Sequence, residues 1–237
     1  MASKPDKENL RASHLPKLSR REIIDIKQTK CLDESPIFER LDSDTFTILK
    51  VLGQGNHATV FEVNVDDETY ALKMFHCGEE AHYLAEAATY QTITDMEFND
   101  VWTPKCFGYG TSDFWYDGII KQFSNVPFTE GISTYQVILL EYMQAEARYE
   151  IEYLKKNFIA ALDGLHTLRI THNSIKPENL YWEYHSKGRL TARIIDLGRA
   201  RSYPLKTDST NQQVKNDKKN LKKSLNAAAA AVTVADA

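Results

Sequence analysis

Two glycines separated by a single residue could hold a phosphate group. Gly53 and Gly55 lie between two runs that favour β-strand, and Val60 follows them in the second run. Because glycine has no Cβ, this turn can bring backbone N–H groups close to phosphate oxygens, while the valine can cover a flat base. A Gly-x-Gly between strands is also common as a plain hairpin turn. The strand after it argues against a dinucleotide site, where a helix should follow.

Lys73 lies inside a third apolar run, two residues after the small Ala71. A lysine in an apolar strand needs an anion as partner, and the alanine leaves room for an adenine ring. Glu86 on the following predicted helix is the best partner, because Glu79 and Glu80 fall in the first turn, where carboxylates favour the helix dipole. For this pair taken alone, a solvated lysine beside a solvated glutamate is the alternative.

A third segment, from His172 to Asn179, reads H-N-S-I-K-P-E-N, and Asp196-Leu197-Gly198 follows it after a strand-like run. Together with the glycine turn, Lys73 and Glu86, and in this order, these residues resemble the protein kinase signature. In that signature a catalytic loop H-R-D-L-x-x-x-N precedes D-F-G. The resemblance covers residues from about 47 to 201, and the I-K-P-E-N stretch is most similar to the serine/threonine branch.

The resemblance implies that the chain binds ATP together with Mg²⁺. The glycine turn would cover the nucleotide, Lys73 would hold the α- and β-phosphates, and Glu86 would orient this lysine. Adenine would lie between Ala71 and Leu180, with Leu140 at the back of the pocket and the backbone of two hinge residues at the adenine edge. The implied nucleotide-binding residues are Leu52, Gly53, Gly55, Val60, Ala71, Lys73, Leu140, Glu141, Met143 and Leu180.

The same resemblance assigns the metal and the reacting phosphate. Asn179 and Asp196 would ligate Mg²⁺, a hard cation that prefers oxygen ligands, and Lys176 would face the γ-phosphate. His172 would serve the fold through hydrogen bonds to the backbone. The implied catalytic group is Lys73, Glu86, Ser174 and Lys176.

Ser174 stands where the kinase signature has its proton-accepting aspartate, and Asn173 replaces the usual arginine. A serine hydroxyl is a very poor base. General-base assistance is typically worth about 10² to 10⁴ in rate, so its loss predicts weak or absent phosphotransfer rather than loss of ATP binding. Leu197 in place of phenylalanine and Ala58 in place of a third glycine are milder departures.

The elements that must position these residues form an α+β pattern. Short β-branched or aromatic runs predict strands, and the first three read as an antiparallel meander. Apolar residues recur at helical spacing in the longest helix and indicate a core-facing stripe. The predicted strands are 46–52, 59–65, 69–75, 135–143, 180–184 and 190–195, and the predicted helices are 79–94 and 148–168.

The predicted organisation is one protein kinase-like domain between two polar tails. An antiparallel β-rich N-lobe with one helix (45–140), a hinge (141–145) and an incomplete helical C-lobe (146–205) make up the domain, 45–205. Residues 1–44 and the low-complexity, Lys-rich stretch 206–237 are expected to be disordered, because they hold too few apolar residues to offset the entropy of ordering.

The residues after Asp196 contain no Ala-Pro-Glu and predict none of the helices of a kinase peptide platform. The favoured hypothesis is therefore a pseudokinase-like domain that binds ATP and Mg²⁺ and serves a docking partner. One alternative is an active, divergent serine/threonine kinase that transfers the γ-phosphate to a protein substrate. A second alternative is a truncated product of a longer kinase gene.

Composition excludes few classes of function. Hydrophobic residues make up 42% and charged residues 26% of the chain, and a net charge of −4 gives no reason to propose nucleic acid as a partner. Cys31, Cys77 and Cys106 have no metal-ligand spacing, and the seven histidines show none either. No apolar run is long enough to cross a membrane. We therefore expect reduced thiols and a cytoplasmic or nuclear location.

Overall fold

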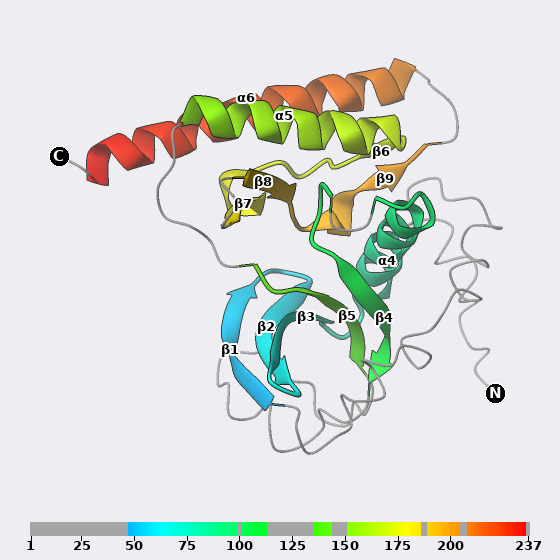
Figure 1. The fold of residues 1–237 in the computed structure, drawn as a ribbon. Helices are drawn as coiled ribbons and strands as arrows, with labels where there is room; N and C mark the ends of the chain where they lie inside the picture. Colours follow the sequence, from blue (N-terminus) through cyan, green and yellow to red (C-terminus); the bar gives the residue numbers. More distant parts are fainter. Residues whose placement is uncertain are drawn as a thin grey trace. The chain divides into compact units, whose positions relative to one another are not determined.

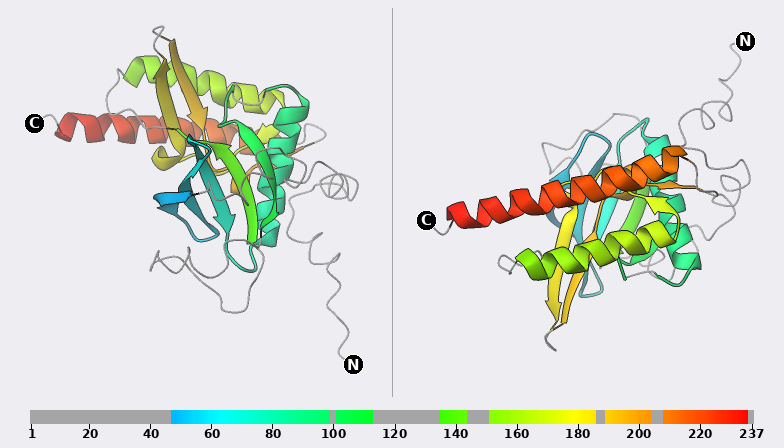
Figure 2. Two further views of the ribbon diagram at one scale, coloured as in Figure 1. Left: turned by 60° about the horizontal axis from the view of Figure 1, so that its bottom comes forward. Right: turned by 90° about the horizontal axis from the view of Figure 1, so that it is seen from above.

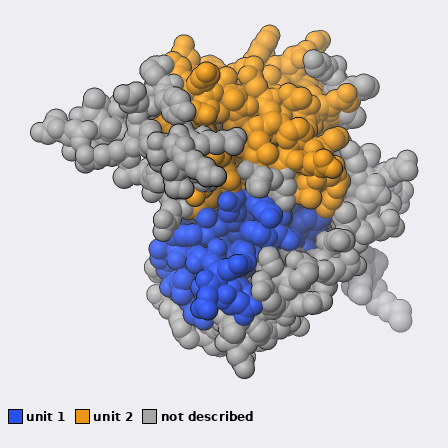
Figure 3. Space-filling model, viewed as in Figure 1, with its two compact units in different colours: residues 1–88, 105–142 blue, residues 89–104, 143–237 orange. Residues whose placement is uncertain are grey.

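The computed structural model describes residues 47–98, 101–112, 135–143, 151–185, 189–203 and 208–235. The chain divides into two compact units, which Figure 3 colours separately. Unit 1 comprises Met1–Ala88 and Lys105–Tyr142, and unit 2 comprises Thr89–Pro104 and Met143–Ala237. The expected disordered tail 1–44, the hinge beyond Met143 and the turn at 186–188 lie outside the described residues.

Unit 1 is built on one antiparallel sheet with the strand order β1-β2-β3-β5-β4 (Figure 1). The predicted three-strand meander is confirmed, and the continuous apolar strand is confirmed as β5. β4 was not predicted, because glycines interrupt its sequence and weaken the strand pattern. The strands are β1 (Thr47–Gln54), β2 (Ala58–Val65), β3 (Glu68–Phe75), β4 (Cys106–Ser112) and β5 (Tyr135–Glu141).

The core of this sheet follows from its strand patterns. β2 alternates buried and half-buried residues, so one of its faces is covered, whereas β3 is buried continuously from Tyr70 to Phe75. Phe61, Leu72 and Ile138 have no exposed surface. These β-branched, aromatic and leucine side chains explain why the three runs form strands.

Helix α4 (Glu80–Asp95) follows β3, and its bounds agree with the predicted helix to within one residue. The division between the two units falls inside this helix, after Ala88. Its first turn carries Glu80, and its next turns bring Glu86 toward β3. The helix therefore contributes a functional side chain to unit 1 from its amino-terminal half.

Two of the three cysteines are described, and both are free thiols as expected. Cys77 is exposed. Burial raises the pKa of the Cys106 thiol to about 12, although its S–H donates to the carbonyl oxygen of Gly108 at 3.6 Å. Because the thiolate is the reactive form, Cys77 is the more accessible and more reactive of these two described thiols.

Unit 2 packs two helices against a hairpin and a pair of very short strands. The predicted apolar stripe of the first helix is buried at Leu154, Phe158, Leu162 and Leu165. β7 and β8 pair as an antiparallel hairpin, and β6 pairs with β9. The elements are α5 (Ile151–Thr167), β6 (Ile170–Thr171), β7 (Leu180–His185), β8 (Arg189–Ile194), β9 (Arg201–Ser202) and α6 (Asp208–Ala235).

Helix α6 corrects the expectation of a disordered tail after residue 206. It is 28 residues long and lies beside α5, as Figures 1 and 2 show. The expectation was wrong because the buried stripe is largely polar: among the helix side chains that the structure describes, Leu221 and Leu225 are the buried apolar ones. Its successive buried positions are seven, four, three and one residues apart, which places them on one side of the helix. They are Thr210, Asp217, Leu221, Ser224 and Leu225.

None of the helices in the described parts of the chain has both the length and the apolar character that a membrane crossing requires. The expected cytoplasmic or nuclear location stays a prediction.

Candidate functional site

Lys73 and Glu86 form the ion pair that the sequence predicts. The Lys73 Nζ lies 2.6 Å from the Glu86 Oε2, and the carboxylate side chain is fully buried while the lysine side chain is 10% exposed. β3 supplies the lysine and α4 the glutamate, thirteen residues apart. A buried ammonium requires such a partner, because an uncompensated charge in this apolar sheet would be strongly unfavourable.

Several predicted nucleotide-binding residues share one face of the sheet. Val60 on β2 lies directly opposite Lys73, and Leu140 on β5 lies directly opposite Ala71. Directly opposed residues of an antiparallel pair point to the same face, and so do residues two apart in a strand. Val60, Ala71, Lys73 and Leu140 therefore line a common face, with the lysine the one charged group among them.

The glycine turn connects β1 to β2 next to this face. Gly53 pairs with Val60, and the Gly55 N–H donates to the Ala58 carbonyl at 2.9 Å. A Cβ added at Gly53 would meet no atom of the described chain within 4 Å, and one added at Gly55 would make only an ordinary contact. The fold of unit 1 does not itself require glycine there. Leu52, at an irregularity of β1, is 40% exposed.

The predicted hinge residues fall in both units. The Glu141 N–H donates to the Lys105 carbonyl at 2.8 Å, and its carboxylate accepts from the Lys105 N–H at 3.0 Å. Any bond of this residue to an adenine edge would therefore use its carbonyl oxygen. Met143 and Leu180 belong to unit 2, and both are buried.

His172 is fully buried at the start of the loop that carries Ser174. Its Nε2 lies 2.9 Å from the Ile195 carbonyl, and the Ser174 N–H lies 3.2 Å from its Nδ1. A carbonyl only accepts, so the Nε2 carries the proton and the Nδ1 accepts, which defines a neutral imidazole. The predicted structural role of His172 is confirmed, and both ring nitrogens are occupied by the backbone.

Asn173 adopts a left-handed backbone with φ of 59°, a conformation that asparagine tolerates better than most residues. Its side-chain Nδ2 lies 3.0 Å from the Thr171 Oγ1 and 3.2 Å from the Arg199 carbonyl. The residue that replaces the arginine of the signature thus ties the loop to the segment after Asp196.

Asn179 brings Ser174 and Asp196 together in unit 2. Its Nδ2 donates to the Ser174 carbonyl at 2.9 Å and lies 3.4 Å from the Asp196 Oδ2. The Ile195 N–H donates to the Asn179 carbonyl at 2.9 Å, and Asp196 has a left-handed backbone. Because the amide nitrogen contacts protein oxygens, only the Asn179 amide oxygen could bind a cation, beside the Asp196 carboxylate. Lys176, two residues after Ser174, is exposed.

Asp217 on α6 is the functional residue that sequence reasoning missed. Its carboxylate is fully buried and accepts the His172 N–H at 2.7 Å and the Asn173 N–H at 2.9 Å. The His166 Nε2 lies 3.2 Å from the same carboxylate. Two backbone N–H groups of the Ser174 loop thereby find a charged acceptor, which is the strong kind of hydrogen bond. The helical spacing of Asp217 with Leu221 and Leu225 is the signal that could have found it.

Comparison with known proteins supports the same interpretation. No protein-family model matches the chain. The chloroplastic serine/threonine-protein kinase STN7 of Arabidopsis thaliana is 26% identical over 182 residues, 66% of this chain and 30% of that kinase. YPK1 of Saccharomyces cerevisiae is 27% identical over 155 residues, 61% of this chain and 20% of that kinase. The kinase gad8 of Schizosaccharomyces pombe is 25% identical over 181 residues, 72% of this chain and 28% of that kinase.

The chain is a distant homologue of serine/threonine protein kinases.

It spans 30% or less of the length of each of these three kinases. Its antiparallel five-stranded sheet with one helix, followed by a helical region, is an α+β arrangement consistent with part of a kinase fold. The predicted fold class and the predicted family are confirmed.

This kinase-like domain carries its predicted residues in two separate groups. The Lys73–Glu86 pair, with Val60, Ala71 and Leu140 on the same sheet face, belongs to unit 1. The second group belongs to unit 2 and contains Ser174, Lys176, Asn179, Leu180 and Asp196. In the second group, hydrogen-bond contacts connect Ser174, Asn179 and Asp196. Lys176 is exposed and Leu180 is buried.

Proposed function

We propose that this kinase-like domain binds ATP with Mg²⁺ and that its phosphotransfer is weak or absent. The observation that carries the proposal is the buried Lys73–Glu86 pair at 2.6 Å. An ammonium that pairs with a carboxylate beside Val60, Ala71 and Leu140 is placed to receive a second anion, and a polyphosphate is the anion that the homology favours.

The rest of the face in unit 1 supports a flat base next to that anion. Ala71 and Leu140 are buried, opposite each other, and offer a small apolar surface. The glycines of the β1–β2 turn are not required by the packing of unit 1, so their lack of side chains supports close approach by a ligand. Leu52, Gly53, Gly55 and Val60 would cover this ligand. The Glu141 carbonyl and the backbone of Met143 would meet the adenine edge, and Leu180 is the residue of unit 2 that the kinase resemblance assigns to the adenine.

The group in unit 2 supports a site for Mg²⁺. The Asn179 amide oxygen and the Asp196 carboxylate are neighbouring oxygen donors, and Mg²⁺ requires oxygen ligands that it shares with phosphates. The cation would neutralise charge on the phosphates. Lys176 would contribute a further positive charge toward the γ-phosphate.

Weak phosphotransfer is expected because Ser174 accompanies the Asn179 and Asp196 oxygens. Ser174 offers a neutral hydroxyl where an aspartate would accept the substrate proton, and loss of general-base assistance lowers the rate by about 10² to 10⁴. His172 cannot replace it, because both ring nitrogens are bonded to the backbone. Slow transfer stays compatible with a loose transition state, which needs little help from a base.

Calorimetric titration of the full chain with ATP, in the presence and absence of Mg²⁺, tests the binding. We expect Lys73→Met to abolish binding and Asp196→Asn to remove the dependence on Mg²⁺. Lys105→Ala is the matched control, because this lysine of unit 1 is exposed and its hydrogen bonds to Glu141 are made by the backbone. Equal affinity in the parent chain and in Lys73→Met would overturn the proposal.

The competing function is an active, divergent serine/threonine kinase with a protein substrate. Transfer of labelled γ-phosphate to the chain itself or to a generic protein, lost in Asp196→Ala, would favour it. The Ser174→Asp variant separates the cases further. A pseudokinase-like domain whose only defect is the base should gain at least tenfold in transfer rate with the carboxylate restored, within the range that a general base contributes.

A further inference from the structure

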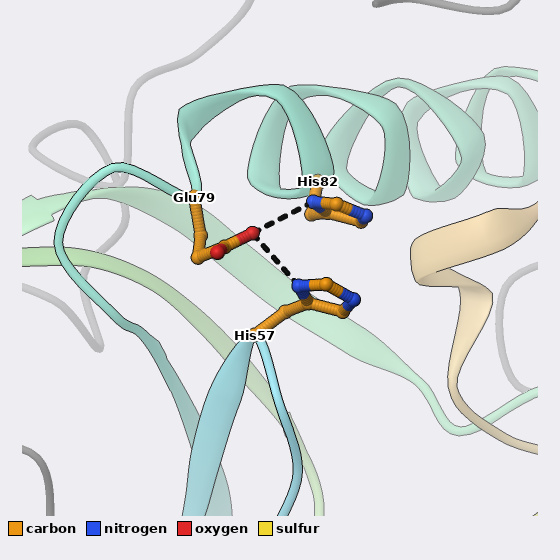
Figure 4. A group of neighbouring side chains, drawn as sticks. All are labelled: His57, Glu79 and His82. Carbon is orange, nitrogen blue, oxygen red and sulfur yellow. Dashed lines mark hydrogen bonds and ion pairs between the residues drawn. The ribbon is translucent and has the colours of Figure 1, made fainter.

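A cluster of three ligand-type side chains lies in unit 1, outside the residues that the proposed function uses. His57 comes from the turn between β1 and β2, Glu79 immediately precedes α4, and His82 lies in the first turn of that helix (Figure 4). One ligand atom from each residue lies within 4.8 Å of the other two. Sequence spacing cannot reveal this cluster, because one imidazole comes from a different element from the other two residues.

The two imidazoles converge on a single point. The His57 Nδ1 and the His82 Nδ1 each lie 2.8 Å from the same atom, the Glu79 Oε2 (Figure 4). Their rings stack with centroids 3.7 Å apart and planes 13° apart, so the two nitrogens point the same way. A carboxylate oxygen accepts only, so each Nδ1 must carry a proton here.

A metal ion could occupy the point on which these three side chains converge. We propose that His57, Glu79 and His82 form a binding site for a divalent transition-metal ion, with Zn²⁺ as the probe. Two imidazoles and one carboxylate are a known Zn²⁺ donor set with an open fourth position for water. The ion would take the place of the two Nδ1 protons, and each neutral ring would then carry its proton on Nε2. Imidazole ligands favour Zn²⁺ and its neighbours over Mg²⁺ and Ca²⁺, which prefer oxygen.

The size of the cluster fits such an ion. Zn²⁺ binds nitrogen and carboxylate oxygen at about 2.0–2.2 Å, whereas the Glu79 oxygen now lies 2.8 Å from each nitrogen. The carboxylate must therefore withdraw by a small side-chain rotation, and the ion would sit between it and the rings. Exposed fractions of 34%, 27% and 33% for the side chains of His57, Glu79 and His82 leave room for this movement and for entry of the ion.

The backbone around His76 holds the two halves of the cluster in place. The His76 N–H donates to the His57 carbonyl at 2.9 Å, and the His76 carbonyl accepts the Glu79 N–H at 3.1 Å. The His76 ring itself is bonded to the Thr59 Oγ1 at 3.0 Å and the Asn56 carbonyl at 3.2 Å. His76 is thus a scaffold residue, and the ligands on either side of it are preorganised.

The site would fasten the glycine turn to the start of α4. His57 lies within the segment Gly53–Val60, and Glu79 and His82 lie about one to two turns before Glu86 on the same stretch of chain. Metal binding would therefore restrain the two parts of unit 1 that the proposed function uses. The inference does not depend on that function, since its residues and its test involve neither ATP nor Lys73.

Direct metal binding to the full chain is the test. All titrations use the full chain with the substitution Cys77→Ser, which removes an exposed thiol that could bind Zn²⁺ elsewhere. The protein is freed of metal with EDTA before calorimetric titration with Zn²⁺. We expect one equivalent to bind. His57→Ala, Glu79→Gln and His82→Ala should each weaken this binding at least tenfold, because even residues that only support metal ligands cost 10- to 100-fold when they are changed.

Glu80→Gln is the matched control, since it removes a carboxylate one residue from Glu79 that is not part of the cluster. It should bind Zn²⁺ like the parent. Equal binding by the parent and by His82→Ala would overturn the proposal and leave a plain hydrogen-bonded network.

A second measurement needs no variant. Carbethoxylation of histidines by diethyl pyrocarbonate, mapped by mass spectrometry, should be at least tenfold slower at His57 and His82 when Zn²⁺ is present, because a coordinated ring is a poor nucleophile. Unchanged labelling of both histidines would also overturn the proposal. Mg²⁺ at the same concentration should give no protection, and equal protection by Mg²⁺ would contradict a transition-metal site.

Discussion

In unit 1, the charged side chain of Lys73 is held by another side chain, Glu86, thirteen residues away on the next element. In unit 2, the loop around Ser174 is held through its backbone, because the Asp217 carboxylate accepts the N–H groups of His172 and Asn173 from 45 and 44 residues away. One anchor joins two side chains and the other joins a side chain to the main chain.

This difference determines whether a second substitution can restore the stability that a first substitution removes. When one member of a side-chain pair is lost, the other member can be replaced as well, and the buried charge disappears with it. Backbone N–H groups cannot be removed in the same way, so the loss of their acceptor leaves them buried and unsatisfied. The anchor in unit 2 should therefore be the more sensitive of the two.

The largest effect is expected for Asp217→Ala. The buried His172 N–H and the partly buried Asn173 N–H lose their acceptor at a cost of about 2 kcal/mol each, so the free energy of unfolding should fall by about 4 kcal/mol. Urea titration of the full chain measures this loss. Amide hydrogen exchange at His172 and Asn173 locates it, and both amides should lose protection while those of β2 and β3 keep theirs.

Asp217→Asn serves as the control for this change. It keeps one acceptor oxygen at nearly the same position. Its free energy of unfolding should therefore fall by about half as much as that of Asp217→Ala, and one of the two amides should stay protected from exchange. If Asp217→Ala left the protection at His172 and Asn173 unchanged, the anchor would not have the role that the contacts indicate.

The two anchors also differ in whether they could be predicted from the sequence. The Lys73–Glu86 pair could be predicted because a lysine in an apolar strand demands a carboxylate, and the next helix supplies one within a short stretch of chain. Asp217 could not, because its helix carries few apolar residues and many lysines, so it read as a solvated tail. Two of the three partners of Asp217 are also main-chain N–H groups, which leave no mark in the sequence.

The sheet shows the same contrast on a smaller scale. β2 and β3 are rich in β-branched and aromatic residues, and their bounds could be predicted almost to the residue. β4, with its two glycines, is held by its pairing with β5 rather than by its own preference, so its sequence gave no strand signal. The left-handed backbone of Asn173 and Asp196 likewise depends on surroundings that the sequence does not display.

The next effect in size concerns Glu86→Ala in unit 1. The Lys73 ammonium would lose its carboxylate in a buried site, and the free energy of unfolding should fall by about 3 kcal/mol. Adding Lys73→Met to this variant should restore most of the loss, because an apolar side chain of similar length suits the sheet. The same urea titration measures both variants.

The double variant tests the contrast itself. If Lys73→Met did not recover stability in the Glu86→Ala background, the pair in unit 1 would be no easier to repair than the anchor in unit 2, and the distinction drawn above would fail. Glu80→Ala, at an incompletely buried position one turn and a half earlier on α4, should change stability by less than about 0.5 kcal/mol and provides the control.

The smallest effect is expected at Gly164 on α5, and its sign carries the information. Alanine normally stabilises a helix relative to glycine by about 0.5–1 kcal/mol. A Cβ at position 164, however, would overlap the indole of Trp102, so Gly164→Ala should instead destabilise the full chain by about 1–2 kcal/mol, as overpacking does.

In a Trp102→Leu background the overlap is gone, and the same substitution should become neutral or stabilising. Trp102 belongs to the stretch Thr89–Pro104, which is part of unit 2 although the sequence on both sides of it belongs to unit 1. This reversal of sign would show that the stretch packs on α5. Stabilisation by Gly164→Ala in the parent chain would mean that it does not.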